Sequence, residues 1–274
     1  MIDEATALAR VRAHFPELAA KRAVLLGGHA IRSFLVDDAF VFRFTADATR
    51  LEIELRLLDA LAPHVPFAVP AHGFRAAGIY GHPVLAGPIA RVARYEPAQL
   101  GAALGRALAA LAAFPIRDAL ALGMRWRSEP SHNLAALFRD LVSRYERARR
   151  TLDPVLSARG DALVLRARVP APYLDAAALV HGGISQFTVH VGDRLGLAAW
   201  DEVNFGDPAV DLGCIGFAFG RTALDAAIGA MNRPDLAERA AFVVRCTALS
   251  IVVDPSTPDA AKSWALERSL WLAT

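Results

Sequence analysis

The chain has 274 residues, of which 54% are hydrophobic and 21% are charged, and this composition is typical of a compact globular protein. Its formal net charge is +2, and its arginines are scattered instead of forming the basic stripe that neutralises a phosphate backbone. Composition and charge therefore argue against disorder and against nucleic acid as a partner.

The cysteines and the apolar stretches indicate in which cellular compartment the protein is expected. Cys214 and Cys246 are the only cysteines, so a disulfide framework is excluded, and their spacing is not that of metal ligands. The most apolar stretches, such as residues 102–114, are too short or too interrupted by arginine to cross a bilayer. The amino terminus carries Asp3 and Glu4 and lacks the basic start and apolar run of a secretory signal. We expect a cytoplasmic protein with no membrane partner, and the oligomeric state stays open.

The first part of the chain combines short apolar runs with helical patterns. A helical pattern is followed by three apolar runs, with the turn-forming pair Asp37-Asp38 before the third. A second helix ends before Pro63, and two more short strands follow. The predicted elements are a helix at 4–18, strands at 23–26, 33–36 and 40–44, a helix at 51–61, and strands at 67–69 and 82–86. This order predicts an amino-terminal lobe, residues 1–88, made of an antiparallel sheet and a helix.

From Pro97 onward the apolar period becomes helical, with Leu100, Leu104 and Leu108 on one face of a long helix. The predicted helices cover residues 100–114, 133–152, 223–231, 234–252 and 258–271. A β-hairpin interrupts them, with strands at 187–191 and 195–200. The pattern predicts a mainly helical carboxy-terminal lobe, residues 89–274, and an α+β fold with two lobes.

Two segments of the second lobe carry a longer pattern of polar residues. Residues 181–188 (HGGISQFT) precede the hairpin, and residues 200–212 (WDEVNFGDPAVDL) overlap its end and follow it. Together they resemble the catalytic core of the aminoglycoside, choline and homoserine kinase-like phosphotransferases. Members of that family carry His-Gly-Asp, an Asn five residues after the Asp, a hairpin, Ile-Asp-Trp and Gly-Asp-Pro-x-x-Asp-Leu. The resemblance implies a bilobal protein-kinase-like fold, in which Asp207 and Asp211 anchor the loop by accepting hydrogen bonds from backbone amides.

Arg43 and Glu54 extend the resemblance into the first lobe. Arg43 lies at the position of the family's basic phosphate-binding residue, and Glu54 at that of the helix glutamate that pairs with it. The pair is either a remnant of a nucleotide site or a structural bridge between helix and sheet. The family's glycine-rich first hairpin is only partly kept, in Gly27-Gly28-His29.

Three positions depart from the family pattern. Gly183 stands at the position of the catalytic Asp, Thr188 at that of the Asn, and Ala199 at that of the metal-binding Asp. Phosphoryl transfer needs these groups to position the acceptor and to hold magnesium. The departures therefore predict that conventional phosphoryl transfer from ATP with magnesium is lost, and no metal or cofactor is expected.

Asp201 offers one route by which magnesium binding could persist. It lies two positions after Ala199, and strand alternation would place both side chains on one face, about 6 to 7 Å apart. Magnesium accepts little error around a ligand distance of about 2.1 Å, so the displaced carboxylate could serve only if the loop were rebuilt. ATP and magnesium are expected only under this alternative.

Three residues are candidates for a catalytic role in a repurposed cleft. Asp201 and Glu202 are adjacent carboxylates. They either bind a cation or transfer protons, or they lie at the solvated start of a loop without a chemical role. His181 is either a general base or a packing and hydrogen-bonding element of its loop. Ser185 is close to His181 in sequence, and geometry must decide whether the two residues cooperate.

The favoured hypothesis is a degenerate aminoglycoside-phosphotransferase-like protein that uses the cleft between its lobes to bind or transform a small metabolite. Such a protein is either a repurposed enzyme acting on a small molecule or a pseudokinase that binds a ligand or partner without turnover. The alternative is an active small-molecule kinase, an antibiotic or metabolite O-phosphotransferase, with relocated metal ligands. Neither hypothesis names the substrate, because fold analogy does not supply one.

Overall fold

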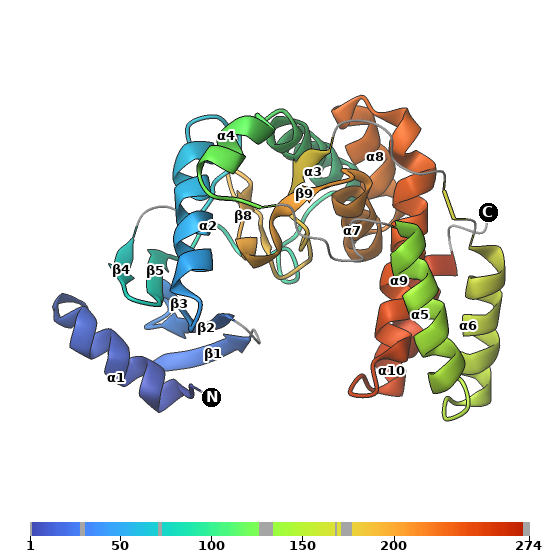
Figure 1. The fold of residues 1–274 in the computed structure, drawn as a ribbon, viewed down its shortest axis with the longest axis horizontal. Coiled ribbons are helices and arrows are strands. Elements are labelled where there is room, and N and C mark those ends of the chain that lie inside the picture. The colour runs from blue at the N-terminus through green and yellow to red at the C-terminus, as the bar shows by residue number, and fades with distance from the viewer. Residues whose placement is uncertain are drawn as a thin grey trace.

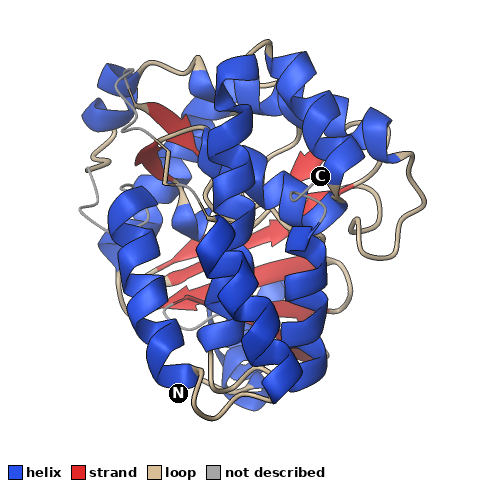
Figure 2. Ribbon diagram, turned by 90° about the vertical axis from the view of Figure 1, so that its right-hand side faces the viewer, coloured by secondary structure: helices blue, strands red, loops and turns tan. Residues whose placement is uncertain are grey.

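The computed structural model describes residues 2–27, 31–70, 73–125, 134–167, 169–170 and 177–270. Figure 1 shows a sheet-containing lobe at the amino-terminal side and long helices at the opposite side. Figure 2, viewed from the helical side, shows the long helices in front of the strands. The two-lobed α+β architecture predicted from the sequence is confirmed.

The amino-terminal lobe is an antiparallel sheet with α1 against one face and α2 against the other. Its five strands pair in the order β1-β2-β3-β5-β4. The elements are α1 (Glu4–His14), η1 (Pro16–Leu18), β1 (Ala23–Gly27), β2 (Ile31–Val36), β3 (Phe40–Thr45), α2 (Ala48–Leu61), β4 (Phe74–Ala76) and β5 (Ile79–Pro83).

Alternation along β2 and β3 sorts their side chains between the two faces of the sheet. Phe34 and Phe42 are fully buried in the apolar cluster that α1 joins through Ala7 and Val11. Arg43 points to the other face, toward α2, and lies opposite Tyr80 of β5. This face of the sheet therefore presents Arg43 to α2, together with Arg75 of β4, which pairs with Asp59 on α2.

The carboxy-terminal lobe is mainly helical. Its elements are α3 (Pro97–Ala112), α4 (Ile116–Ala121), α5 (Leu134–Ala148), α6 (Pro154–Arg166), β6 (Ala178–Val180), β7 (Val189–His190), β8 (Gly196–Leu197), η3 (Trp200–Glu202), β9 (Asn204–Gly206), α7 (Ala209–Phe219), α8 (Arg221–Met231), η4 (Pro234–Leu236), α9 (Ala237–Val253) and α10 (Asp259–Leu270). α3 packs closely on α8 because Gly101 and Gly105 face Ala223 and Ala227, with no room for a Cβ atom on either glycine. A separate core joins α5, α6, α9 and α10. None of the described helices is long and apolar enough to cross a membrane.

Some predicted elements differ from the observed ones. Residues 67–69 make only a single bridge, between Ala68 and Gly196, and the strand expected at 82–86 is β5, which begins earlier. Helices α4, α6 and α7 lie where no helix was predicted. The residues Gly28 and His29 of the glycine-rich hairpin lie outside the described residues. The division between the lobes at residue 88 stays a prediction.

Candidate functional site

A buried carboxylate holds the loop that resembles the family's catalytic loop. Asp211, in the first turn of α7, accepts hydrogen bonds from the backbone N–H groups of His181 at 2.7 Å and Gly182 at 2.8 Å. Burial raises the pKa of Asp211 to about 6. Gly182 has a φ of 79°, and a Cβ there would press on the backbone carbonyl of Glu202, so the turn requires glycine. The anchoring role predicted for Asp211 is confirmed.

His181 is fully buried and uses both ring nitrogens inside the loop. Its Nδ1 accepts the backbone N–H of Gly183 at 3.2 Å, which places the ring proton on Nε2. Nε2 donates to the carbonyl of Ala198 at 3.0 Å, and the ring packs edge-on against Trp200 at a centroid distance of 4.7 Å. Burial lowers the pKa of His181 to about 4, so the ring is neutral at pH 7. The geometry supports the packing role of His181 over that of a general base.

The three positions that depart from the family pattern differ in what the backbone allows. Gly183 has room for a Cβ atom, since the nearest atom to an added Cβ would be Nδ1 of His181, in ordinary van der Waals contact at 3.8 Å. Thr188 turns its hydroxyl into the loop, where it donates to the Gly183 carbonyl at 3.0 Å and accepts the N–H of Ser185 at 2.8 Å. Ala199 has a left-handed backbone with a φ of 60°, a conformation that Asp adopts more readily than Ala. The backbone at Gly183 and Ala199 would thus accommodate the aspartates of the family pattern, but neither residue carries a carboxylate.

These residues do not fit the magnesium site that the family implies. Gly183 and Ala199 have no side-chain ligand atom, and the hydroxyl of Thr188 is used within the loop. Across the described ranges, no three His, Cys, Asp or Glu side chains are grouped so that they could hold a metal ion. The strand argument for Asp201 is wrong, because β8 ends at Leu197 and the 3-10 turn η3 follows, so strand alternation does not apply.

Ser185 does not cooperate with His181 as a nucleophile would with its base. Its hydroxyl lies 3.3 Å from that of Thr188 and accepts the backbone N–H of Phe187 at 3.2 Å. Both nitrogens of His181 are occupied by backbone groups. The geometry therefore does not form a nucleophile and base pair here.

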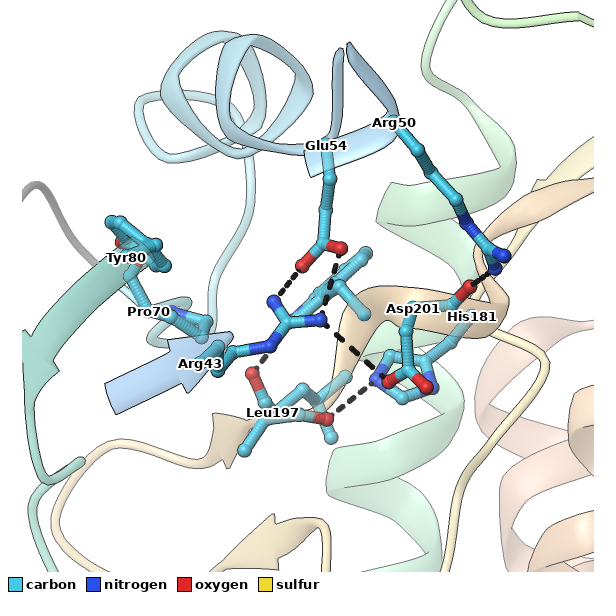
Figure 3. A network of polar contacts seen from close by, with 10 residues as sticks. Arg43, Arg50, Glu54, Pro70, Tyr80, His181, Leu197 and Asp201 are labelled. Atoms are coloured by element: carbon cyan, nitrogen blue, oxygen red, sulfur yellow. Dashed lines mark hydrogen bonds and ion pairs between the residues drawn. The ribbon is translucent and has the colours of Figure 1, made fainter. Parts of the chain in front are cut away.

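A buried ion pair joins the sheet to α2 (Figure 3). The two terminal nitrogens of Arg43 donate to the two carboxylate oxygens of Glu54, one of them at 3.1 Å, and both residues are 4% exposed. Burial lowers the pKa of Arg43, but the Glu54 carboxylate more than offsets this effect and the net shift is upward. Tyr80 lies beside the pair, and burial raises its pKa to about 12. The pairing predicted from the sequence is present, and its geometry fits both a nucleotide-site remnant and a structural bridge.

Asp201 connects the second lobe to this ion pair. One of its carboxylate oxygens lies 3.9 Å from Nη2 of Arg43, and its backbone carbonyl accepts a hydrogen bond from Nη2 of Arg50 on α2 (Figure 3). The Asp201 side chain is 36% exposed. Of the three candidate catalytic residues, Asp201 joins the network between the lobes, whereas Glu202 is exposed and His181 is occupied within its loop.

Asp207 anchors the start of α7. Its carboxylate accepts the backbone N–H of Ala209 at 2.9 Å and Nε of Arg239 on α9 at 2.7 Å. Since Asp207 is buried, the Arg239 charge compensates it where water cannot. The structural role predicted for Asp207 is confirmed, and its arginine partner was not predicted.

A cavity of about 340 Å³ lies between α2 and η3. Its wall also includes the segment that follows α4. The lining residues are Asp47, Thr49, Arg50, Ile53, Glu54, Leu57, Gly123, Met124, Arg125, Trp200, Asp201 and Val203. The sequence pointed to Glu54 and Asp201 but not to Arg50 or Arg125, because no motif marks either arginine and only packing brings them together.

The sequence matches the phosphotransferase enzyme family over residues 22–242, and the chain belongs to this family. A comparison with curated protein sequences finds no match. The fold is similar to that of the GDP complex of wild-type aminoglycoside 2'-phosphotransferase-IIIa, with a TM-score of 0.72 and 20% identity over 99% of this chain and 97% of that chain.

Two further solved structures are similar across most of the chain. Macrolide 2'-phosphotransferase MphH from Brachybacterium faecium has a TM-score of 0.63 and 21% identity over 94% of this chain and 97% of that chain. Spectinomycin phosphotransferase in complex with ADP and spectinomycin has a TM-score of 0.61 and 12% identity over 99% of both chains. These likenesses confirm the kinase-like fold that the motifs predicted.

Proposed function

We propose that this chain does not carry out conventional phosphoryl transfer from ATP with magnesium, and that it binds or transforms a small molecule in the cleft between its lobes. The loop around His181 carries this proposal. Its backbone is held by Asp211, yet Gly183, Thr188 and Ala199 supply neither an acceptor-positioning carboxylate nor a metal ligand. Positioning and charge neutralisation provide almost all of the catalysis in phosphoryl transfer, so the loss of these groups removes the chemistry itself.

The cleft keeps groups that support another role. Asp201 and Arg43 come from different lobes and lie 3.9 Å apart, and Asp201 also lines the cavity beside α2. A carboxylate in this place can accept a hydrogen bond or a proton from a ligand. The proposal covers a repurposed enzyme and a binding protein without turnover, which differ in whether the ligand leaves chemically changed.

An ADP-release assay tests the proposal. The wild-type protein is incubated with ATP and magnesium, alone and with kanamycin or a macrolide, and we expect no ADP above background. The triple variant Gly183→Asp, Thr188→Asn, Ala199→Asp is the comparison, because a Cβ at Gly183 meets no atom closer than 3.8 Å and Ala199 has a backbone that suits Asp. We expect ATP with magnesium to raise the melting temperature of the triple variant and not that of the wild type.

ATP turnover by the wild-type protein would overturn this proposal. If Asp201→Asn then abolished the turnover, the result would support the alternative, an active small-molecule kinase with a relocated metal ligand. Glu202→Gln is the matched control, because it removes a neighbouring carboxylate that is exposed.

A further inference from the structure

The cavity between α2 and η3 combines an apolar lining with a charged rim. Its apolar lining comes from Ile53, Leu57, Met124, Trp200 and Val203. Leu57 and Trp200 are fully buried, so packing fixes this part of the wall. Small-molecule sites commonly pair such a lining with a few placed polar groups, in volumes from about 300 Å³ upward. The cavity is therefore of the size and character that suit a compact organic ligand.

The carboxylates of the wall already have partners within the protein. Glu54 accepts hydrogen bonds from both terminal nitrogens of Arg43. Asp47 is the N-cap of α2 and accepts the backbone N–H of Arg50 at 2.9 Å. Asp201 lies 3.9 Å from Arg43. These contacts reduce the attraction of the three carboxylates for a further cation.

Arg50 and Arg125, the two arginines of the cavity wall, differ from these carboxylates in their partners. Within the described part of the chain, neither Arg50 nor Arg125 forms an ion pair with a carboxylate. Arg50 donates through Nη2 to the neutral backbone carbonyl of Asp201, and Arg125 is exposed at the rim. An anionic group would find uncompensated positive charge here.

We propose that this cavity binds a small apolar carboxylic acid, with the carboxylate between Arg50 and Arg125 and the body against the apolar lining. Net charge does not select the ligand, because the three carboxylates and the arginines at positions 43, 50 and 125 sum to zero. The ligand is selected instead by the two arginines that form no ion pair with a carboxylate of the described residues, since a guanidinium group binds a carboxylate through two parallel hydrogen bonds. The inference rests on the proposed small-molecule role of the cleft and not on the loss of phosphoryl transfer.

Three probes of similar shape test which charge the cavity selects. Phenylacetate, phenylacetamide and phenethylamine are titrated into the full chain at pH 7 by isothermal titration calorimetry. We expect phenylacetate to bind about tenfold or more tightly than phenylacetamide, because charge-assisted hydrogen bonds are about twice as strong as neutral ones. Phenethylamine should bind more weakly than either, since its ammonium group would face the two arginines.

Single substitutions locate the site. Arg125→Gln and Arg50→Gln should each weaken phenylacetate binding about five- to tenfold and change phenylacetamide binding less. Ile53→Trp, which fills the cavity from α2, should abolish the binding of both probes. Arg221→Gln is the matched control, because Arg221 is an exposed arginine that pairs with Asp225 on α8, and its affinity should equal that of the wild type. A melting curve shows whether each variant is folded.

Several outcomes would overturn the inference: equal affinity for acid and amide, preference for the amine, or no binding of phenylacetate up to about 10 mM. An unchanged phenylacetate affinity in Arg125→Gln would also overturn it. Arg125 is exposed, so this variant decides the matter even if Arg50→Gln fails to fold. Failure of the proposed function is detected separately, as ATP turnover by the wild-type protein, which the titration does not measure.

Discussion

Ala199 holds a backbone conformation that its own side chain disfavours. Its φ of 60° and ψ of 69° lie in the left-handed region, which costs an L-residue about 1–2 kcal/mol, whereas glycine adopts it freely. The Ala199→Gly variant should therefore raise the free energy of unfolding by up to about 1 kcal/mol, after about 0.4–1 kcal/mol is subtracted for the greater entropy of the unfolded chain. The corresponding rise in melting temperature is about 2–4 °C per kcal/mol for a chain of this size.

Ala198→Gly is the control for this variant, because Ala198 is the adjacent residue and has no positive φ. It should lower the melting temperature, since glycine then loses entropy on folding without relieving any strain. A melting temperature of Ala199→Gly that falls as far as that of Ala198→Gly would contradict the account of strain at Ala199.

Three buried groups govern how stability depends on pH between about 4 and 6.5. Burial lowers the pKa of His181 and of His82 to about 4, and raises the pKa of Asp211 to about 6. Between about pH 4 and 6.5 each histidine is protonated in the unfolded chain and neutral in the folded protein, so each destabilises the fold increasingly as the pH falls through this range. Asp211 acts oppositely, because the folded protein keeps its proton. The balance is about one proton more in the unfolded chain, so the free energy of unfolding should fall by about 1 kcal/mol per pH unit on acidification.

The His82→Gln variant tests this balance. His181 and Asp211 then nearly cancel, so the free energy of unfolding should be almost independent of pH between about 4.5 and 6. Urea unfolding followed by tryptophan fluorescence at several pH values measures the slope for both proteins. A slope in His82→Gln as steep as that of the wild type would mean that His82 does not stay neutral in the folded protein.

The packing of α3 on α8 depends on the absence of a side chain at Gly105. An added Cβ would overlap the backbone of Ala227, which cannot move aside as a flexible side chain would. Gly105→Ala should therefore lower the free energy of unfolding by about 1–3 kcal/mol. Gly229→Ala is the control on α8, where an added Cβ meets no atom within 4 Å among the described residues beyond its own helix backbone and chain neighbours, and it should raise stability by about 0.5–1 kcal/mol. Changes of the same sign in urea unfolding would contradict the close approach of these helices.

Periodic helices were predictable from the sequence, and reversals of the backbone were not. The predicted helix at 223–231 corresponds to α8, because its apolar period is strong and Asn232 ends it in a left-handed conformation. The second hairpin strand ends earlier than predicted because Ala199 turns the chain, and alanine gives no signal for such a turn. α6 has Asp153 as its N-cap and Pro154 in its first turn. Both are sequence signals of a helix start, so this helix could have been predicted.

The candidate site also has a part that was predictable from the sequence and a part that was not. The loop from His181 to Thr188 was recognisable because its residues are contiguous and their spacing is specific. The cavity was not, because Arg50 and Arg125 lie far apart in the sequence and meet only when α2 packs beside the segment after α4. Residue types alone do not distinguish these arginines from the many on the surface.

The two lobes meet at the Arg43 guanidinium. Glu54 contacts it from α2, and Asp201 approaches it from the second lobe. The two carboxylates differ in energetic weight, because the Glu54 side chain is 4% exposed and that of Asp201 is 36% exposed. Asp201→Asn should therefore change the free energy of unfolding by less than about 1 kcal/mol. Removing Glu54 leaves a buried charge with only a distant partner.

Unfolding and nucleotide binding together distinguish a structural bridge from a nucleotide-site remnant at Arg43 and Glu54. Glu54→Leu should lower the free energy of unfolding by about 3–5 kcal/mol, because the Arg43 charge stays buried, and the double variant Arg43→Met, Glu54→Leu should recover most of this loss. Urea unfolding of the wild type and both variants measures the difference. A structural bridge also predicts that ATP with magnesium leaves the melting temperature of the wild type unchanged. If ATP raised that melting temperature and the double variant, though folded, lost the effect, the pair would instead be a working part of a nucleotide site.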